Sequence, residues 1–138
     1  MSEPEVRYGT GVWVRRENML LIGLRNTLSG KGTWCPPGGH VDPGEDHETC
    51  ARREIMEEAS IQIENLRDLN IVIPDLNIEL NALYKTTFYT ADWKAEEPVP
   101  LPTEYDEWRW VRWEELPQPL FRPAALFVER HGNPLEIK

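Results

Sequence analysis

Hydrophobic and polar positions alternate near the start of the chain in the manner of a β-hairpin. Residues 6–15 alternate and are rich in β-forming side chains, a polar pair follows, and residues 19–24 form a short apolar run. Residues 25–33 are a loop by composition. Two prolines exclude a helix from residues 34–39, so this segment must present its backbone at a sharp bend.

One helix is predicted over residues 47–60. The stretch 45–59 lacks Gly and Pro and is rich in Glu, Arg, Ala and Met, which favour helices. β-Branched and aromatic residues then predict two strands, 61–73 and 78–93, with a turn at residues 74–77 between them.

The last third of the chain predicts a loop, a strand and a closing helix. Residues 94–102 contain three prolines and acidic side chains, which is typical of a surface loop. Residues 108–113 predict a strand with Trp108 and Trp110 on one face. Residues 122–131 predict a helix, in which a proline is tolerated in the first turn.

Length and charge narrow the class of protein. The 138 residues leave room for one domain, residues 1–138, and the order of elements predicts an α+β fold or an α/β/α sandwich around a mixed sheet. Fifteen Lys and Arg against 24 Asp and Glu give a net charge of −9, which disfavours polymeric nucleic acid and anionic lipid as partners. No apolar run suffices for a membrane span and residues 1–7 lack a secretory signal, so a cytoplasmic location is expected. Cys35 and Cys50 are expected as reduced thiols.

Three glutamates of the predicted helix gather on one side of it. Glu54, Glu57 and Glu58 are spaced i, i+3 and i+4 and therefore share one face. Ala51 and Ile55 lie on an adjoining face, so the helix can bury one side and hold the acids at a rim. Carboxylate oxygens suit hard cations, with Mg²⁺ as first choice and Mn²⁺ as second. The alternative is a solvated acidic face.

The spacing around these acids resembles the signature of the Nudix hydrolases. That signature reads Gly, five residues, Glu, seven residues, Arg and Glu, an aliphatic residue, any residue, two Glu, any residue, Gly and an aliphatic residue. The chain matches it at Gly39, Glu45, Arg53, Glu54, Ile55, Glu57, Glu58 and Ile61. Ser60 stands where the family has Gly, and we expect a small distortion there because a left-handed backbone is common just past a helix.

The resemblance extends to a fold and a metal site. Trp34, the segment 37–40 and the Trp-rich segment 108–117 also look like a Nudix domain. The likeness implies a Nudix-type α/β/α sandwich with a central mixed β-sheet. It also implies that the metal ion is held by Glu54, Glu57, Glu58 and the carbonyl of Gly39.

Further roles follow from the same resemblance. Glu45 and Arg53 are expected to brace the loop and the helix, because a carboxylate beside a guanidinium forms a geometrically fixed, charge-assisted pair. Glu54, Arg53 and Glu57 are the candidate catalytic residues, with Glu54 as the base or the residue that holds it. Related enzymes often use a further acid from a loop before the last strand, for which Glu104, Glu97 and Asp106 are available, with Glu104 as the candidate loop base.

The implied activity is Mg²⁺-dependent hydrolysis of a nucleoside diphosphate linked to another moiety. The chain looks most like the MutT-like branch, which cleaves nucleoside triphosphates to the monophosphate and pyrophosphate. Nucleotide sugars, ADP-ribose and dinucleoside polyphosphates are alternative substrates, and a Nudix-fold nucleotide-binding regulatory module is the non-enzymatic alternative. The expected partner is a small-molecule nucleotide, and a homodimer is expected from the resemblance alone.

Five residues are candidates for substrate contacts: Trp34, Gly38, His40, Arg25 and Tyr89. Aromatic rings can stack on a nucleobase, and a cation or imidazole can meet a phosphate. The alternatives are core packing for the two aromatic rings, a structural or solvated role for the histidine, and a solvated guanidinium for the arginine.

Overall fold

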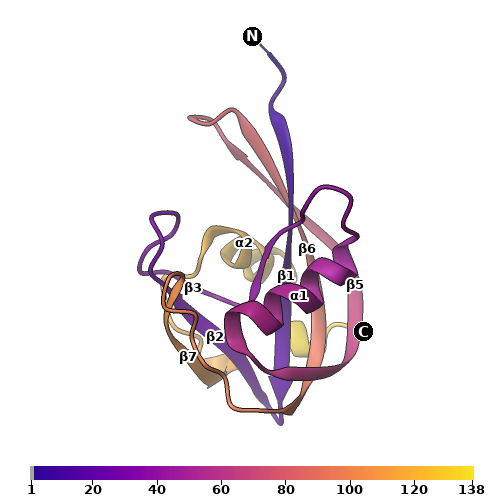
Figure 1. Ribbon diagram of the computed structural model, residues 1–138, viewed down its shortest axis with the longest axis vertical. Helices are drawn as coiled ribbons and strands as arrows, with labels where there is room; N and C mark the ends of the chain where they lie inside the picture. The colour runs from indigo at the N-terminus through magenta and orange to yellow at the C-terminus, as the bar shows by residue number, and fades with distance from the viewer. Residues whose placement is uncertain (1) are drawn as a thin grey trace.

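Seven strands, two α-helices and two short 3₁₀ helices make up residues 2–138, the range that the computed structural model describes (Figure 1). In chain order they are β1 (Glu5–Arg16), β2 (Met19–Arg25), β3 (Trp34–Cys35), β4 (Gly38–His40), α1 (His47–Ala59), β5 (Gln62–Asn77), β6 (Ala82–Ala95), β7 (Tyr105–Arg112), η1 (Trp113–Glu115), α2 (Arg122–His131) and η2 (Pro134–Glu136). Neither α-helix of this range is long and apolar enough to span a membrane.

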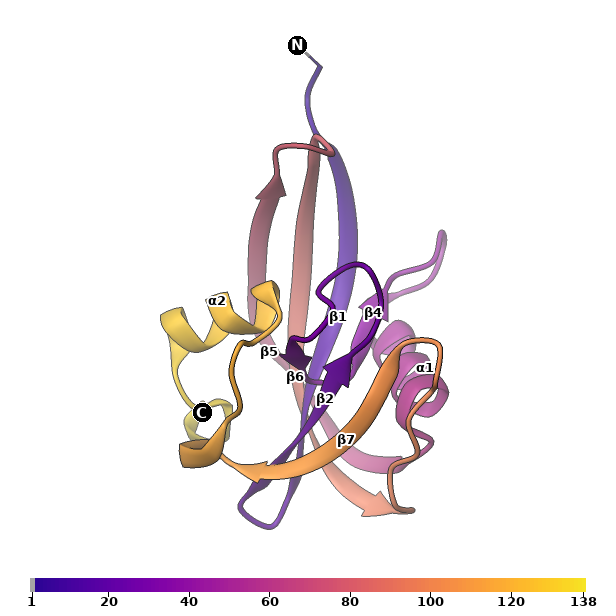
Figure 2. The same cartoon turned by 90° about the vertical axis from the view of Figure 1, so that its left-hand side faces the viewer.

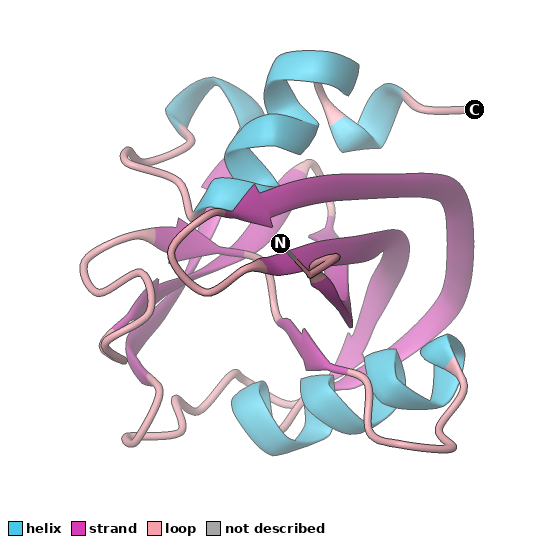
Figure 3. Ribbon diagram, turned by 90° about the horizontal axis from the view of Figure 1, so that it is seen from above, coloured by secondary structure: helices cyan, strands magenta, loops and turns pink. Residues whose placement is uncertain are grey.

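All strands join one mixed sheet. Its order is β3-β2-β1-β6-β5, with β4 paired to β1 and β7 paired to β2. β1 and β2 form the predicted antiparallel hairpin, whereas β1 and β6 run parallel from the Glu5–Ala82 pair to the Arg15–Asp92 pair. Helix α1 covers one face of the sheet and α2 the other (Figure 3). The predicted sandwich around a mixed sheet is therefore confirmed.

The two helices bury both faces of the sheet. Successive side chains of β1 point to opposite faces, so this strand contributes to the core on both sides. Trp13 faces α2 and packs against Phe88 and Phe127, with ring centroids 6.0 and 5.4 Å away. Val12 faces α1 and belongs to a second cluster with Ile55 of that helix. This second cluster seats α1 on the sheet by its apolar side and leaves its acidic side at the rim.

A long arm of three strands extends beyond the two helices (Figures 1 and 2). It is built from β1, β6 and β5, and residues 78–81 form the turn at its tip. The turn predicted at residues 74–77 is wrong, because Pro74 lies inside β5, paired with Lys85. β5 is an edge strand, and an edge position tolerates a residue that has no N–H to donate.

Helix α1 has the predicted start and ends one residue early. It begins at His47, where the side chain of Asp46 accepts a hydrogen bond from the Thr49 amide at 2.7 Å and so caps the first turn. It ends at Ala59. Ser60 follows in the left-handed conformation, with φ 57° and ψ 34°, which is the distortion expected where the family has Gly.

The C-terminal elements lie close to their predicted positions. β7 begins three residues before the predicted strand, and Trp113 belongs to η1 rather than to the strand. Trp108 and Trp110 both pack against the cluster beneath α1, which confirms that they share a face. Both cysteines are buried free thiols, as expected.

Candidate functional site

The acidic side of α1 lies against the short glycine-rich strand β4. This strand pairs with β1 through Gly39 and Thr10, and α1 packs beside it. A Cβ on Gly38 would collide with the carbonyl oxygen of Thr10, and one on Gly39 would lie 2.5 Å from Cδ of Glu54. Glycine at position 38 therefore lets β4 approach the backbone of β1 this closely, and glycine at position 39 leaves the Glu54 carboxylate its place.

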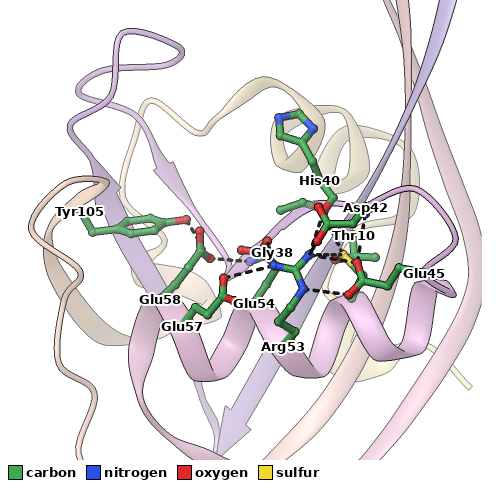
Figure 4. A network of polar contacts seen from close by, with 12 residues as sticks. Thr10, Gly38, His40, Asp42, Glu45, Arg53, Glu54, Glu57, Glu58 and Tyr105 are labelled. Atoms are coloured by element: carbon green, nitrogen blue, oxygen red, sulfur yellow. Dashed lines mark hydrogen bonds and ion pairs between the residues drawn. The ribbon is translucent and has the colours of Figure 1, made fainter.

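Arg53 joins three of the acids in one network (Figure 4). Its Nε and Nη2 donate to the two oxygens of Glu45 at 2.8 and 2.9 Å. Its Nη1 donates to Oε1 of Glu54 at 2.9 Å and to Oε2 of Glu57 at 3.1 Å. Nη2 also donates to the carbonyl oxygen of His40 at 3.2 Å. The planar guanidinium thus fixes the loop acid, two helix acids and β4 relative to one another.

The carboxylates of the site sit in different electrostatic environments. Hydrogen bonds from Arg53 lower the pKa of Glu45 to about 2. Burial raises the pKa of Glu54 above its ordinary value. Burial also raises the pKa of Glu58 to about 9, and the neighbouring Glu104 carboxyl adds to the rise. The surroundings of Glu54 and Glu58 therefore disfavour their charged forms, and a bound cation would stabilise those charged forms.

Glu58 is held by contacts of its own. It is only 4% exposed, and its Oε1 accepts hydrogen bonds from the Gly38 amide at 3.0 Å and from the Tyr105 hydroxyl at 3.3 Å. Its main-chain carbonyl accepts a hydrogen bond from Nε1 of Trp108 at 3.0 Å. Tyr105 and Trp108 were not among the predicted site residues. Their pairing with α1 depends on how β7 is placed, which local sequence patterns do not reveal.

The C-terminal end of α1 is fixed by partners distant in sequence. The last four carbonyls of a helix have no partner within it. Here the indole of Trp108 satisfies the carbonyl of Glu58, and the amide of Val99 donates to the carbonyl of Ala59 at 2.9 Å. These bonds stabilise the acidic turn although Ser60 replaces the glycine that usually follows it.

A cavity of about 600 Å³ opens beside β4. Its walls come from β1, β4, β5, β6, the loop between β2 and β3, and the start of α2. Gly38, Gly39 and His40 line the end nearest the acidic network, and Arg25 lines the loop side. The volume lies within the range of small-molecule binding sites. Three of the predicted substrate residues, Gly38, His40 and Arg25, are thus brought to one cavity.

The other two predicted substrate residues lie in the core. Trp34 is 8% exposed and packs in the cluster on the α2 side, with the Arg109 guanidinium 4.7 Å from its ring centroid. Tyr89 is 4% exposed and packs in the cluster beneath α1. Neither ring lines the cavity, so the structure does not bring these two candidates together with the other three. Trp34 packs on one face of the sheet and Tyr89 on the other, and both faces are covered, as the core-packing alternative describes.

Arg25 and His40 both line the cavity, but their polar groups make different contacts. The Nε of Arg25 donates to the carbonyl of Ser29 at 3.0 Å, and its guanidinium lies 3.9 Å from the Phe121 ring centroid, so it braces its own loop. His40 exposes its side chain and uses its carbonyl to accept from Arg53. Glu104 lies in the loop just before β7, close enough to the acids to raise the pKa of Glu58.

The three helix acids fit a divalent cation by their chemistry. Across residues 2–138, no three acidic, His or Cys side chains already stand in ligating positions. Glu54 and Glu57 are instead bonded to Arg53, and Glu58 is bonded to Gly38. The three carboxylates nevertheless share one helical face, and two of them have raised pKa values. Such oxygen donors suit Mg²⁺ or Mn²⁺.

The chain has a mixed sheet between two helices and therefore belongs to the α/β/α sandwich class. An acidic helix face and a glycine-rich strand lie beside its cavity and form a site that suits a cation. The NUDIX domain model matches residues 5–131. The chain therefore belongs to the Nudix family.

Named relatives agree with this assignment. The MutT NUDIX hydrolase from Burkholderia pseudomallei superposes with a TM-score of 0.84 at 28% identity, covering 92% of this chain and 98% of that one. The asymmetrical bis(5'-nucleosyl)-tetraphosphatase of Caenorhabditis elegans is 36% identical over 83 residues, 59% of this chain and 60% of that protein. The NAD-capped RNA hydrolase NudC of Pseudomonas syringae is 28% identical over 138 residues, 95% of this chain and 48% of that protein. The chain thus spans between about half and three fifths of these two curated relatives.

Proposed function

We propose that this chain is a divalent-metal-dependent hydrolase of nucleoside diphosphates linked to another moiety. The favoured reaction is cleavage of a nucleoside triphosphate to the monophosphate and pyrophosphate. The observation that carries the proposal is the Arg53 network, which gathers Glu45, Glu54 and Glu57 beside a glycine-rich strand and a cavity. The hydrolases named among its relatives support it.

The proposed metal ligands are Glu54, Glu57, Glu58 and the carbonyl of Gly39, with Mg²⁺ as the cofactor and Mn²⁺ as the alternative. The bound ion would neutralise phosphate charge and lower the pKa of a ligated water. The non-enzymatic alternative, a regulatory binding module, is disfavoured because all three helix acids are present and share one face.

The protein's own groups position the reactants and move the proton. Arg53 and Glu45 hold the helix acids against β4, so that the carboxylates converge without rearrangement of the backbone. A carboxylate near the attacking water must accept its proton as the new bond to phosphorus forms and the anhydride P–O bond breaks, with the leaving phosphate oxygen taking the electron pair. Glu54 is the proposed base, since it is partly buried and faces Gly39, and Glu104 is the second candidate.

The nucleoside is proposed to occupy the cavity beside β4, with its phosphates toward Gly38 and Gly39. The net charge of −9 favours a small nucleotide over polymeric RNA. A second candidate substrate is a dinucleoside polyphosphate, because the Caenorhabditis elegans relative at 36% identity is named as a bis(5'-nucleosyl)-tetraphosphatase. A homodimer, a cytoplasmic location and a single domain over residues 1–138 stay predictions from the sequence.

A substrate panel tests the proposal. The protein is incubated with nucleoside triphosphates, a nucleotide sugar, ADP-ribose and diadenosine tetraphosphate, each with Mg²⁺, with Mn²⁺ or with EDTA, and the products are separated by chromatography. Pyrophosphate released from a triphosphate in the presence of the ion supports the favoured reaction. Cleavage of diadenosine tetraphosphate alone selects the second candidate, and inactivity toward every compound overturns the enzymatic proposal. Light scattering checks the dimer.

A further inference from the structure

Tyr105 reaches the acidic helix because of an irregularity in β7. The pairing of β2 with β7 runs Gly23–Trp108, Leu24–Glu107 and then Arg25–Tyr105, so Asp106 is skipped. In a regular strand, residues three apart point to opposite faces. The extra residue is a β-bulge, which turns Tyr105 to the same side as Trp108. The two rings accordingly pack together, with centroids 4.4 Å apart.

The ring of Tyr105 is locked in place. It is 2% exposed, and a Cβ on Gly23 would lie 2.8 Å from its Cδ1, so the neighbouring strand leaves space only for the ring. The Tyr105 hydroxyl lies 3.3 Å from Oε1 of Glu58 and 3.5 Å from Sγ of Cys35. The hydroxyl donates to Glu58, since an oxygen acceptor forms a stronger hydrogen bond than a thiol sulfur does.

Both donors to the Glu58 side chain meet the same oxygen. Oε1 accepts hydrogen bonds from the Gly38 amide at 3.0 Å and from the Tyr105 hydroxyl (Figure 4). Neither of these two groups donates to Oε2. Two donors from different directions fix the rotation of a carboxylate far better than one. The contact also has a main-chain counterpart, because Trp108 of the same strand holds the Glu58 carbonyl.

Glu58 differs in this respect from the other two helix acids. Arg53 donates to Glu54 and to Glu57, and among residues 2–138 no hydrogen bond or ion pair joins Arg53 to Glu58. The third acid therefore needs another support. The Tyr105 hydroxyl supplies a side-chain hydrogen bond to it, while the Glu104 carboxyl stands beside the same group.

We infer that Tyr105 is a positioning residue, which holds Oε1 of Glu58 so that Oε2 is presented as a metal ligand. This inference rests on the proposed function, in that it takes Glu58 as one of the metal-binding acids. Tyr105 touches neither the reacting atoms nor the substrate in this scheme. It does for Glu58 what Arg53 does for Glu54 and Glu57.

The test removes the hydroxyl and measures metal affinity directly. Wild type and Tyr105→Phe are titrated with Mn²⁺ alone in a calorimeter, and the kcat and KM of each are measured on the best substrate of the panel. We expect about tenfold weaker Mn²⁺ binding in the variant, because outer hydrogen-bond partners of metal ligands contribute on that scale. We also expect a lower kcat with an unchanged KM, since the nucleotide cavity does not include Tyr105.

Thr87→Val is the matched control. The buried Thr87 hydroxyl lies 3.3 Å from Nδ1 of the half-buried His47, at the opposite end of α1, so its loss removes a side-chain hydrogen bond of the same helix far from Glu58. The control should keep the wild-type Mn²⁺ affinity. Equal weakening in both variants, or none in Tyr105→Phe, overturns the inference.

A double-mutant cycle distinguishes an effect that acts through Glu58 from a general loss of stability. In a Glu58→Gln background, Tyr105→Phe should cause no further loss of Mn²⁺ affinity. If Tyr105→Phe weakens Mn²⁺ binding as much in this background as in the wild type, the inference is overturned. If wild type cleaves no nucleotide yet Tyr105→Phe still weakens Mn²⁺ binding, the proposed function fails and the positioning role stands. If wild type is active and the two proteins bind Mn²⁺ equally, the positioning role fails alone. A wild type that binds no Mn²⁺ overturns both.

Discussion

Gly39 and Glu54 lie so close together that position 39 has no space for a side chain: a Cβ there would stand 2.5 Å from the carboxyl carbon of Glu54 and 2.6 Å from its Oε2. The glycine of the motif is thus required by the helix opposite it rather than by a left-handed backbone. The identity of residue 39 sets where the Glu54 carboxylate stands.

Gly39→Ala should reduce kcat by about a hundredfold, because a methyl group displaces the Glu54 carboxylate by the order of 1 Å. Gly9→Ala is the comparison, since it also adds a methyl group to the cavity wall, but its Cβ would stand at an ordinary contact distance of 3.4 Å from the Gly39 carbonyl oxygen and would not meet Glu54. Steady-state kinetics and thermal melts of both variants provide the comparison. A wild-type rate in Gly39→Ala would show that the placement of Glu54 does not matter for turnover.

Glu57→Gln should abolish turnover and leave the melting temperature almost unchanged. The side chain of Glu57 is 53% exposed and pairs with Arg53 four residues earlier, so its contribution to the free energy of unfolding is about 0.5 kcal/mol or less. Glu48→Gln offers a matched loss of charge, because Glu48 forms an i,i+4 pair with Arg52 on the same helix, at 3.1 Å. Rate assays should separate the two variants. Similar turnover in Glu57→Gln and wild type would contradict the metal assignment.

The stability of the metal-free protein should fall as the pH rises from 5 to 9. Burial raises the pKa of Glu58 to about 9, above the ordinary value of a glutamate, so folding favours its protonated form. That stabilisation is complete below the unfolded pKa and is lost as the pH rises through the folded pKa. Glu58→Gln cannot ionise and should show a flatter profile.

Urea unfolding in EDTA at intervals across this pH range measures the effect. The raised pKa of Glu54 acts in the same direction, whereas the lowered pKa of Glu45 matters only well below pH 5. Parallel profiles for wild type and Glu58→Gln would show that Glu58 is ionised in the folded protein throughout.

Ser60→Gly should stabilise the protein by about 1 kcal/mol and raise the melting temperature by about 3 °C, with kcat unchanged. Ser60 has a φ of 57°, which costs an L-residue free energy that glycine does not lose. Asn70→Gly, at a φ of 57° in β5, should gain less, since asparagine tolerates this conformation better. Calorimetric melts of both variants make the comparison, and a destabilised Ser60→Gly would refute the strain argument.

The sequence predicted the helix and its acids well because both depend on local spacing. The i, i+3, i+4 positions of Glu54, Glu57 and Glu58 place them on one face in any helix, and the apolar residues between them decide which face is buried. The failed turn at residues 74–77 has a different cause. Whether a proline ends a strand depends on whether the strand lies at a sheet edge, and strand order is a property of the whole fold.

The aromatic residues of the site show the same limit. Residue type alone makes Trp34 and Tyr89 candidates for substrate contacts, whereas the structure packs each ring in a core cluster, because both faces of the sheet are covered. The sequence does not single out Tyr105, because the direction of its side chain depends on the skipped residue Asp106. In a strand of eight residues, a bulge cannot be recognised from the alternation of polar and apolar positions.

The fixed end of α1 bears on attempts to transplant the motif. A graft of residues 38–61 into another scaffold would carry the glycine strand, the guanidinium and all the acids. It would leave behind the segment 99–108, and with it the indole, the amide and the phenol that complete the last turn. A designer who borrows this motif must therefore supply substitutes for three donors that lie outside it.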